Sequence, residues 1–555
     1  MRYLFVLLLL SVSAVAQPLT QTQKLVSLAK LWGFLKYYHP AVAQGKLDWD
    51  GQLIRLLPAV QQAQDVQQLS TRYQSLLDEL GPLKPCRKCL SQTEILAENQ
   101  PNLDLSFLTD SLVFSSPLRH RLSYLRDNHY QGDNYYGKTL KPQAALSFEN
   151  EKAYDQMALP NADYRLLALF RYWNVIHYFY PYKYALDTNW REVLPKLIPL
   201  FEQATTPSAY QLVLYQLTAS IQDSHGVMSS KDPARCLRCN LGRLWLPFEV
   251  QLLNNKAVIT RLYSDSLLLP PFLKIGTIIS HIDGETIQAR VSRLRPYVSA
   301  STPQALLRDM RGLIGAGLEK QASLTLELTG RDTTVLVTCY PYRKLGTNLF
   351  LPISSRYAVS SWLTDQIGYV NMGKLMAKQV DSVISALWGA KAIIFDLRNY
   401  PQDTYGLVGA HLVNKTLPFA RLTGPDKRFP GTFQEVSQVE LSPSKPPRQY
   451  PGKVIVLINE DTQSQAEFTA MSFRLHPHVT FVGGPTAGAD GNMAWVPLPG
   501  GYRTAFSSVG VYYPDGRETQ RIGIFPDILV QPTVEGIRQD QDEVLEQAKR
   551  LLVDR

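Results

Sequence analysis

The spacing of apolar residues divides the chain into three regions that differ in predicted secondary structure. Residues 20–240 carry apolar residues at helical spacing, and residues 245–345 carry short β-type runs. From about residue 350, apolar strands alternate with amphipathic helices, which predicts a largely parallel sheet whose loops at one edge carry function. We therefore expect a multidomain α+β protein with a helical N-terminal part, a β-rich middle part and an α/β domain.

The helical region contains two copies of one unit, residues 17–100 and 161–244. In each copy an aromatic helix ends at a proline, a tryptophan follows, and an amphipathic helix precedes a C-x-x-C pair. The aromatic stretch of the second copy is expected to have two extra residues. The polar residues 101–160 between the copies are predicted to be a linker or a small β insertion. The matching segments are Leu28–Pro40 with Leu167–Pro181, Trp49 with Trp190, and Leu69–Leu80 with Ser208–Ile221.

Histidines occur at two kinds of position in this region. His39 and His177 lie among apolar residues ahead of a proline, which favours packed side chains over ligands. The loop after the last helix of the second copy is Asp223-Ser224-His225-Gly226, whereas the equivalent loop of the first copy, residues 77–81, has no histidine. Since only one copy carries a loop histidine, His225 is a candidate functional residue; the alternative is an ordinary surface histidine.

The middle region, residues 245–345, is predicted to form short strands and one amphipathic helix, Pro303–Ile314. The pattern L-x-x-G-x-x-I-x-x-I-D-G-x-x-I over Leu273–Ile287 resembles the central strands of a PDZ domain. Such domains bind extended peptide termini by adding a strand to a sheet edge. The alternative is a small β-rich spacer. Further strands are expected at Lys256–Arg261, Ala322–Leu328 and Val335–Tyr340.

Residues 346–555 are predicted to form the α/β domain. Its expected strands are Ile367–Val370, Ala392–Phe395 and Val454–Ile458, and its expected helices are Val380–Leu387, Leu407–Val413 and Gln541–Leu552.

The strand Val454–Ile458 leads through a polar turn to Ser464, after which a helix is predicted. A serine at such a turn projects its hydroxyl from a rigid strand, and the free N–H groups of the new helix point toward whatever the hydroxyl attacks. Taken alone, the segment favours a simpler interpretation, in which Ser464 is the helix N-cap and Glu467 its capping-box partner.

Length and charge narrow the functional classes. The 555 residues suit several domains, and the net charge of +9 is dispersed along the chain, which indicates solubility and not nucleic-acid binding. Residues 1–16 combine Arg2, the apolar run Leu4–Leu10 and the small residues Ala14-Val15-Ala16, as a signal peptide does. The run is too short to span a membrane. We expect an exported, soluble protein, periplasmic if the source is a double-membraned bacterium.

Five cysteines are present, two C-x-x-C pairs and Cys339. In an exported chain the pairs Cys86/Cys89 and Cys236/Cys239 favour disulfides, either local or crossed, and the alternative is a structural zinc site made by the four thiolates. Either arrangement is expected to clamp the two helical copies together. Cys339 is predicted to be a buried free thiol.

Together, six segments resemble the carboxyl-terminal processing peptidases and the related core of tricorn protease, over about residues 165–550. The resemblance implies an exported serine endopeptidase with a PDZ-like domain and a catalytic domain of the ClpP/crotonase-like type. The six segments are DSHG (Asp223–Gly226), the PDZ-like insert, IIFDLRNYP (Ile393–Pro401), NEDTQSQAE (Asn459–Glu467), GGPTAG (Gly483–Gly488) and GIFPDILV (Gly523–Val530).

The resemblance also implies catalytic roles. Ser464 occupies the nucleophile position, and one branch of the family has its base, a lysine, where this chain has Ala489. The tricorn-like branch uses a Ser-His pair ahead of the PDZ-like insert, which Ser224 and His225 match, so His225 is the expected general base and Ser224 an indirect support for it. That branch also has a late glutamate. Its position falls on Gln520 here, and Glu518 is the candidate substitute or else a surface carboxylate.

The oxyanion hole is expected to include the N–H of Gln465 and a second donor from the loop after residues 396–398. The family usually has Gly-Gly in that loop, whereas this chain has Gln402 and Asp403, with Gly406 further on as the candidate. These departures keep a second hypothesis, a catalytically inactive protein that binds peptides or other ligands on the same scaffold. The expected partner is a peptide or an unfolded protein tail, and apart from the possible zinc no cofactor is required.

Overall fold

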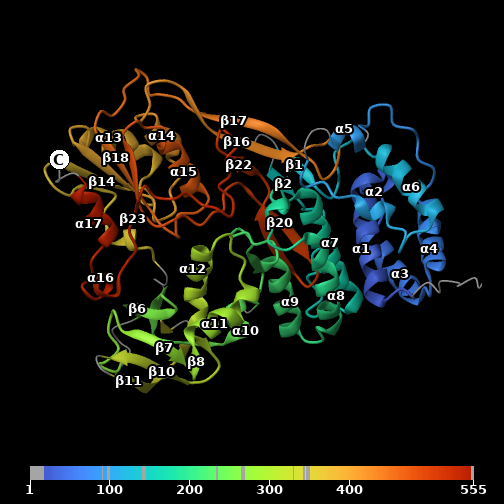
Figure 1. Cartoon of the computed structure of the whole chain (residues 1–555), viewed down its shortest axis with the longest axis horizontal. Coiled ribbons are helices and arrows are strands. Elements are labelled where there is room, and N and C mark those ends of the chain that lie inside the picture. The colour runs from blue at the N-terminus through green and yellow to red at the C-terminus, as the bar shows by residue number, and fades with distance from the viewer. Residues whose placement is uncertain are drawn as a thin grey trace, which may run out of the picture.

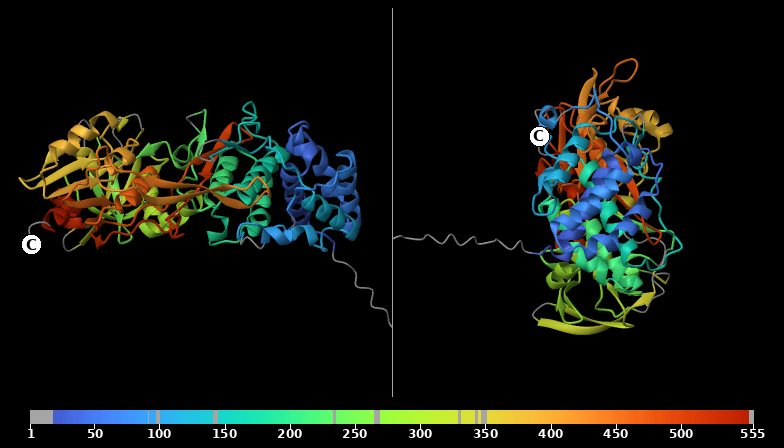
Figure 2. Two further views of the ribbon diagram at one scale, coloured as in Figure 1. Left: turned by 90° about the horizontal axis from the view of Figure 1, so that it is seen from above. Right: turned by 90° about the vertical axis from the view of Figure 1, so that its right-hand side faces the viewer.

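The structure is a computed structural model that describes residues 18–90, 92–96, 100–140, 145–232, 235–263, 269–328, 331–341, 344–345 and 351–551. The predicted signal peptide lies outside these ranges. The molecule is elongated, with the N-terminal helices at one end and the α/β domain at the other (Figures 1 and 2). The β-rich unit lies below the α/β domain in Figure 1, beside the second helical copy.

The two helical copies share one architecture. Each has an 18-residue aromatic helix, α1 (Gln21–Tyr38) or α7 (Ala162–Phe179), and two further helices that pack against it. The further helices are α3 (Trp49–Gln62) and α4 (Val66–Glu79) in the first copy, and α8 (Val193–Gln203) and α9 (Pro207–Ala219) in the second, while short α2 (Pro40–Ala43) follows α1. Side chains of both copies share one hydrophobic core, so the repeats form a single helical body.

A reciprocal tryptophan pair marks the same position in both copies. The indole N–H of Trp32 donates to the carbonyl of Trp49 at 3.0 Å, and that of Trp49 donates back to Trp32 at 3.1 Å. Trp173 and Trp190 repeat this at 2.9 and 3.1 Å. Trp32 and Trp173 are each the twelfth residue of their helix, so the two aromatic helices align without a gap. The expected two-residue insertion in the second copy is therefore wrong.

The aromatic helices cross where Gly33 of α1 meets Asn174 of α7. A Cβ on Gly33 would overlap the Asn174 side chain, whose amide donates to the carbonyls of Ala29 and Phe170 at 2.9 and 2.8 Å. The amide cannot move aside without losing these buried hydrogen bonds. The glycine is thus required for close packing of the two copies.

Gly33→Ala is expected to lower the free energy of unfolding by about 1–3 kcal/mol, because the added methyl overpacks the helix crossing. Denaturant titration followed by far-UV circular dichroism measures this. Gly389→Ala is the matched control, since nothing lies within 4 Å of a Cβ built there. An unchanged midpoint for Gly33→Ala would contradict the close-packing argument.

Four buried charged side chains join the two copies. Lys36 of α1 contacts Glu151 at 2.5 Å, and Arg171 of α7 contacts Glu151 at 3.0 Å and Asp50 of α3 at 2.6 Å. The side chains of Lys36 and Arg171 are 0% exposed. Arg171 also donates to the Pro497 carbonyl at 2.8 Å, so the network reaches the C-terminal part of the chain. Buried charges of this kind are stable only with their partners in place.

The segment between the copies is folded, and part of it packs into the helical core. It contains a short 3₁₀ helix (Ser106–Thr109), helix α6 (Ser116–Asp127) and the hairpin β1 (Lys138–Leu140) with β2 (Ala145–Ser147). Its buried side chains, among them Phe107, Leu118 and Leu146, contact the core of the repeats. The sequence analysis predicted a linker or a small β insertion here and did not predict α6.

The β-rich unit has its own core and a sheet of order β11-β10-β7-β6-β5. Its long helix α12 (Pro303–Ile314) matches the predicted bounds and packs beside β5. The PDZ-like pattern forms β7 (Ile278–Ile282) and β8 (Glu285–Thr286). The other elements are α10 (Leu237–Leu241), β4 (Leu244–Trp245), β5 (Phe248–Leu253), β6 (Lys256–Leu262), α11 (Ile287–Leu294), β9 (Ala316–Gly317), β10 (Gln321–Leu328), β11 (Arg331–Thr338) and β12 (Tyr340–Pro341).

The α/β domain is built on a sheet of order β13-β14-β15-β18-β19-β23, in which all pairs except β13–β14 are parallel. Its central strands are apolar on both sides because separate clusters of buried side chains cover the two faces. The elements are β13 (Ser360–Trp362), β14 (Ile367–Asn371), α13 (Val380–Ala386), β15 (Ala392–Asp396), α14 (Tyr405–Gly409), β18 (Lys453–Ile458), α15 (Gln465–Phe473), β19 (Val479–Gly483), β23 (Ile528–Leu529), α16 (Val534–Arg538) and α17 (Glu543–Arg550).

Two small antiparallel sheets tie the α/β domain to the helical body. In the first, β20 (Met493–Leu498) and β21 (Tyr502–Ser507) pair with β3 (Met228–Ser230), which follows the second helical copy. In the second, the long hairpin β16 (Leu417–Pro425) and β17 (Phe433–Leu441) pairs with β22 (Gly510–Tyr512) and extends along the upper edge of Figure 1 toward the helices. The sequence analysis did not predict this hairpin.

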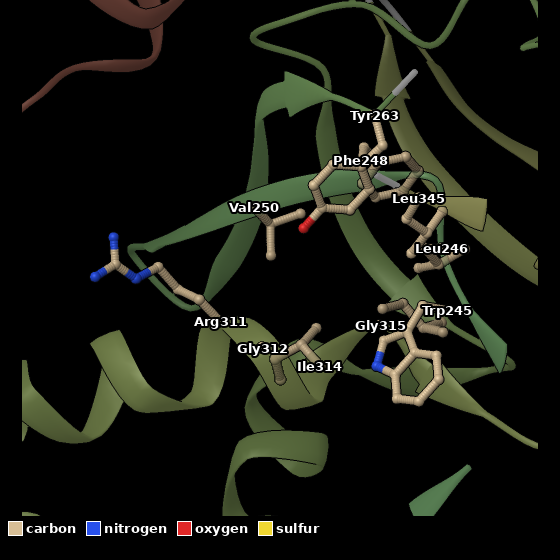
Figure 3. A pocket seen from close by; sticks show the side chains of 11 residues that line it. Trp245, Leu246, Phe248, Val250, Tyr263, Arg311, Gly312, Ile314, Gly315 and Leu345 are labelled. Carbon is tan, nitrogen blue, oxygen red and sulfur yellow. The ribbon is translucent and has the colours of Figure 1, made fainter. Parts of the chain in front are cut away.

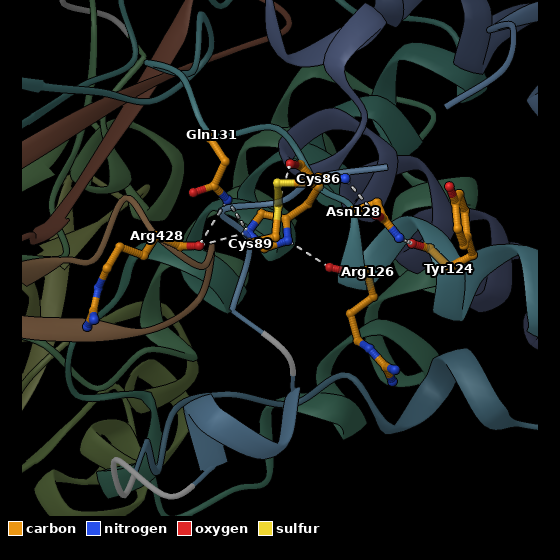
Figure 4. Close-up of a disulfide and its surroundings, with 8 residues drawn as sticks. Cys86, Cys89, Tyr124, Arg126, Asn128, Gln131 and Arg428 are labelled. Atoms are coloured by element: carbon orange, nitrogen blue, oxygen red, sulfur yellow. Dashed lines mark hydrogen bonds between the residues drawn. A yellow bond between two sulfur atoms is a disulfide. The ribbon is translucent and has the colours of Figure 1, made fainter. Parts of the chain in front are cut away.

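The tip of the long hairpin contacts the first helical copy beside a disulfide. Tyr38 of α1 donates to the Pro430 carbonyl at 2.6 Å. In the segment after α6, the His129 ring hydrogen-bonds at 2.7 Å to the carbonyl of Arg428, which is labelled in Figure 4. The disulfide Cys86–Cys89 lies next to this contact, and its Cys86 N–H donates to the Asn128 side chain at 2.8 Å.

Both C-x-x-C pairs form disulfides within themselves, Cys86–Cys89 and Cys236–Cys239. The expectation that they clamp the two copies together is wrong, because each bridge closes only its own turn. Sulfurs joined in this way are not available as zinc thiolates, and among the described residues no cluster of three or more metal-ligating side chains occurs. Cys339 is buried and free, as predicted.

Candidate active site

Ser464 lies at a sharp turn between β18 and α15, and its backbone conformation is unusual. Its φ and ψ are 57° and −121°, a region that non-glycine residues occupy only at a cost of about 1–3 kcal/mol. Other N-cap residues of this chain, such as Thr20 and Asn161, have φ near −66° and extended backbone. Ser464 is the N-cap of α15 and Glu467 its capping-box partner, as the simpler interpretation predicted. An ordinary cap needs no such strain, so the backbone geometry is also that of a serine held outward at the end of a strand.

Glu467, one turn into α15, fixes the backbone around Ser464. Its buried carboxylate accepts hydrogen bonds from the N–H groups of Ser464 at 3.2 Å, Gly488 at 2.8 Å and Ala489 at 2.9 Å, and from the Thr486 hydroxyl. Burial raises the pKa of Glu467 above its usual value, although these donors act in the opposite direction. The carboxylate thus attaches the loop after β19 to the serine turn.

The loop that carries His225 is anchored by strand pairing. Directly after it, β3 pairs with β21, with Met228 opposite Thr504. The His225 Nδ1 atom lies 2.9 Å from the hydroxyl of Ser507, the last residue of β21. This pairing explains how a loop of the helical body reaches the edge of the α/β domain.

The serine turn and the histidine loop touch. Gln463, which precedes Ser464, donates through its side-chain amide to the carbonyl of Ser224, which precedes His225, at 3.4 Å. The two loops that carry the candidate residues are therefore in contact, although they lie far apart in sequence. Within the described residues, no hydrogen bond joins the Ser464 hydroxyl to the imidazole, and the only ring hydrogen bond of His225 is the one from Nδ1 to Ser507.

The surroundings of His225 favour a neutral imidazole. Burial lowers the pKa of His225 below its usual value of 6.5, Asp223 raises it and the Arg308 guanidinium lowers it. The net direction is downward. A neutral ring with a free Nε2 can accept a proton, as a general base must.

The other predicted side chains have different partners. The Ser224 hydroxyl accepts from the Ser301 N–H at 2.9 Å and does not contact the ring of His225 within the described structure. Glu518 accepts from the Tyr184 hydroxyl. Gln520, at the family's glutamate position, donates instead to the Asp223 carboxylate at 3.2 Å. No observation tests the catalytic roles of Ser224 and Glu518, which stay predictions.

The N–H of Gln465, the predicted oxyanion donor, lies at the start of a helix. It is the first residue of α15, and its N–H makes no hydrogen bond in the described structure. Across from it, Asp403 has φ of 54°, the backbone region that the glycine usual at this position adopts readily, and its carboxylate accepts from the Gln465 side chain at 3.0 Å. Gly406, the predicted second donor, lies inside α14, and no observation tests that role.

Two adjoining pockets lead from the β-rich unit toward this site. The first is apolar, lies between β5 and α12, and is lined by Leu246, Phe248 and Ile314 among others (Figure 3). The second is polar and includes Tyr400 and Asp461 of the α/β domain. Val250 and Arg311 line both pockets. Asp461, which lines the second pocket, belongs to the turn between β18 and α15 that carries Ser464.

Side chains of α12 connect the β-rich unit to the serine turn. Arg308 donates to the carbonyl of Glu460 at 2.8 Å, and Arg311 pairs with Asp461 at 2.6 Å. At the start of α12, Thr302 donates to the Ala487 carbonyl at 3.0 Å. The unit is therefore held directly against both loops that flank Ser464.

Comparison with known proteins gives a family. Residues 366–530 match the model of peptidase family S41. No curated protein matches the chain in sequence. Among solved structures, mature CPAF complexed with lactacystin is 14% identical, with a TM-score of 0.55 over 71% of this chain and 98% of that chain. A structure of mature CPAF is 15% identical with the same TM-score, over 71% and 97%. At these identities the likeness shows the fold alone. No helix among the described residues is long and apolar enough to cross a membrane.

Proposed function

Since this chain is a serine-type peptidase of family S41, we propose that it is an exported endopeptidase that cleaves peptides or unfolded protein tails through an acyl-enzyme on Ser464. The observation that carries the proposal is the meeting of two loops, in which the neighbours of Ser464 and His225 are joined at 3.4 Å. Ser464 is the proposed nucleophile and His225 the proposed general base.

The proposed reaction has two halves. The Ser464 hydroxyl attacks the carbonyl carbon of the scissile peptide bond while Nε2 of His225 takes the hydroxyl proton, and the oxyanion is held by the N–H of Gln465. The imidazolium then gives the proton to the leaving amine, and the acyl-enzyme remains. Water, deprotonated by the same Nε2, hydrolyses the ester and regenerates the serine.

A fluorophosphonate probe tests the nucleophile. The wild-type chain is expected to be labelled once, with the adduct on the peptide that contains Ser464, and Ser464→Ala is expected to abolish labelling. Ser382→Ala, at an exposed serine of α13, is the control and should label normally. Peptide binding by a wild-type protein that is neither labelled nor active would favour the inactive binding protein.

The acidic limb of the pH profile reports the base. Protonation of His225 at low pH removes the acceptor for the Ser464 proton, so kcat/KM falls as the pH decreases through the pKa of His225. Because burial places this pKa below 6.5, we expect the midpoint of the limb below pH 6.5. Steady-state hydrolysis of a fluorogenic peptide from pH 4 to 9 measures it. A midpoint well above 6.5 would contradict His225 in this environment as the base.

The β-rich unit is proposed to seat the substrate. In this PDZ-like interpretation, an extended peptide adds to the edge strand β5 and places an apolar side chain in the pocket beside α12. Export is likewise a proposal, supported by the sequence of residues 1–16. N-terminal sequencing of the protein from its source is expected to begin at Gln17, and a retained Met1 would contradict it.

A further inference from the structure

We propose that Ser507 and Asp223 form the group that orients His225, with the Ser507 hydroxyl standing between the imidazole and the carboxylate. The proposal rests on the proposed function, because it assigns positioning residues to the base of that reaction. The residues that the sequence analysis predicted to orient His225 were Ser224 and Glu518. Neither Asp223 nor Ser507 is suggested by its own sequence position.

The hydrogen-bond directions follow from the donors around Asp223. Its carboxylate receives the N–H of His225 at 3.0 Å, the N–H of Ser507 at 2.7 Å and the side-chain amide of Gln520 at 3.2 Å. Each of these groups can only donate to it. The Ser507 hydroxyl, 3.1 Å from the same carboxylate, donates its one proton there as well. Its oxygen therefore has only lone pairs left for the imidazole.

The tautomer of His225 is then determined. At 2.9 Å from Nδ1, a hydroxyl oxygen that has already given its proton to Asp223 must accept, so Nδ1 carries the ring proton. Nε2 is left with its lone pair, which is the form that can take a proton from Ser464. When Nε2 becomes protonated during the reaction, the positive ring faces Asp223 through Ser507. No proton needs to move along the relay; it orients the ring and stabilises its charge.

The relay is held in place because its members come from two separate segments, the histidine loop and β21, and are buried. Asp223 and Ser507 are 0% exposed. Asp223 is further held through its backbone, whose carbonyl accepts from the Ser299 hydroxyl at 2.7 Å, while Ser507 is the last residue of β21 in the sheet with β3. If Ser507 only filled space, its hydroxyl would not need His225 on one side and Asp223 on the other.

Gln520 fits the same interpretation. An amide donates to Asp223 where a second carboxylate would repel it, so a chain with Asp223 in this place requires a neutral residue at position 520. Gln520→Glu is therefore expected to lower activity. If a late glutamate were the orienting group, the same change would raise activity.

The test compares two isosteric substitutions at one site, Ser507→Thr and Ser507→Val, which add the same bulk and differ only in the hydroxyl. We expect Ser507→Val to lower kcat/KM roughly 10²-fold or more relative to Ser507→Thr, chiefly through kcat, with KM little changed. The acid limb is expected to move to lower pH in both Asp223→Asn and Ser507→Val. The first removes the counter-charge of the imidazolium, and the second removes the hydroxyl that joins the ring to that charge. Ser508→Ala, which removes a neighbouring hydroxyl bonded to the Asn492 carbonyl, is the control with unchanged kinetics.

A readout without turnover separates this proposal from the proposed function. In the Ser464→Ala protein, the downfield proton resonance of Nδ1–H of His225 should be present in ¹H NMR and should disappear in Ser507→Val and Asp223→Asn. Circular dichroism establishes that each variant is folded. Equal kcat/KM and equal pH profiles for the Thr and Val variants would overturn the relay while leaving Ser464 as nucleophile. An unlabelled, inactive wild type that still shows the resonance would overturn the peptidase function and leave the relay standing.

Discussion

Replacing Ser464 by alanine is expected to lower kcat/KM for peptide hydrolysis by roughly 10⁴–10⁶-fold. The variant loses the oxygen atom that forms the acyl-enzyme. The conformation of the turn should be unchanged, because Glu467 holds it through the backbone N–H of residue 464, which alanine also has. Residual hydrolysis would come from the Gln465 N–H and from substrate binding. Steady-state kinetics with a fluorogenic peptide provides the measurement.

A double substitution tests whether Ser464 and His225 act as one unit. His225→Ala is expected to lower kcat/KM by a similar factor, and Ser464→Ala with His225→Ala should be no worse than either alone, since groups that act together are strongly non-additive. Multiplicative losses, or a His225→Ala protein with more than about a tenth of wild-type activity, would contradict the pair.

Replacing Arg171 by methionine is expected to lower the free energy of unfolding by about 3–5 kcal/mol, because buried Asp50 loses its ion-pair partner and Glu151 keeps only Lys36. Asp50 and Glu151 lie at 2.6 and 3.0 Å from the guanidinium, and Lys36 alone remains to neutralise them. Arg171 also loses its hydrogen bond to the Pro497 carbonyl, so the contact between the helices and β20 weakens at the same time. Denaturant titration at neutral pH measures the loss.

The matched control is the exposed pair Arg55–Glu79, whose side chains are 58% and 50% accessible. Arg55→Ala is expected to change stability by no more than about 0.5 kcal/mol, since surface ion pairs contribute little. If Arg171→Met lowered the free energy of unfolding as little as Arg55→Ala, the carboxylates of Asp50 and Glu151 would have to be accessible to water. That result would contradict a buried network that links the two copies.

Most of the regular elements could be predicted because their signals are local. Helix α12 begins at Pro303 and ends at Ile314 as its sequence pattern indicates, and β14, β15 and β18 agree within a residue or two because buried parallel strands are uninterrupted apolar runs. The hairpin β16–β17 escaped prediction. Its strand Phe433–Leu441 is mostly exposed, so it lacks the apolar alternation that marks a half-buried strand.

The candidate site could be predicted only in part. Ser464 and His225 each stand in a short motif, and the chain brings their loops together. Asp223 and Ser507 could not be predicted as a pair, because nothing in either segment indicates that β3 pairs with β21. Glu518 was chosen because it is a carboxylate near the family position, whereas the contact to the histidine loop is made by the amide of Gln520. Long-range pairing, and not residue type, decides which side chains meet.

The pairing of β3 with β21 also sets an order of events during synthesis. His225 and Ser507 are 282 residues apart, and the histidine loop has no other strand to bind until the C-terminal hairpin exists. A nascent chain that has emerged only as far as the nucleophile turn therefore lacks an aligned base. Under the proposed function, activity would therefore be expected only after β21, which ends at Ser507, has been synthesised.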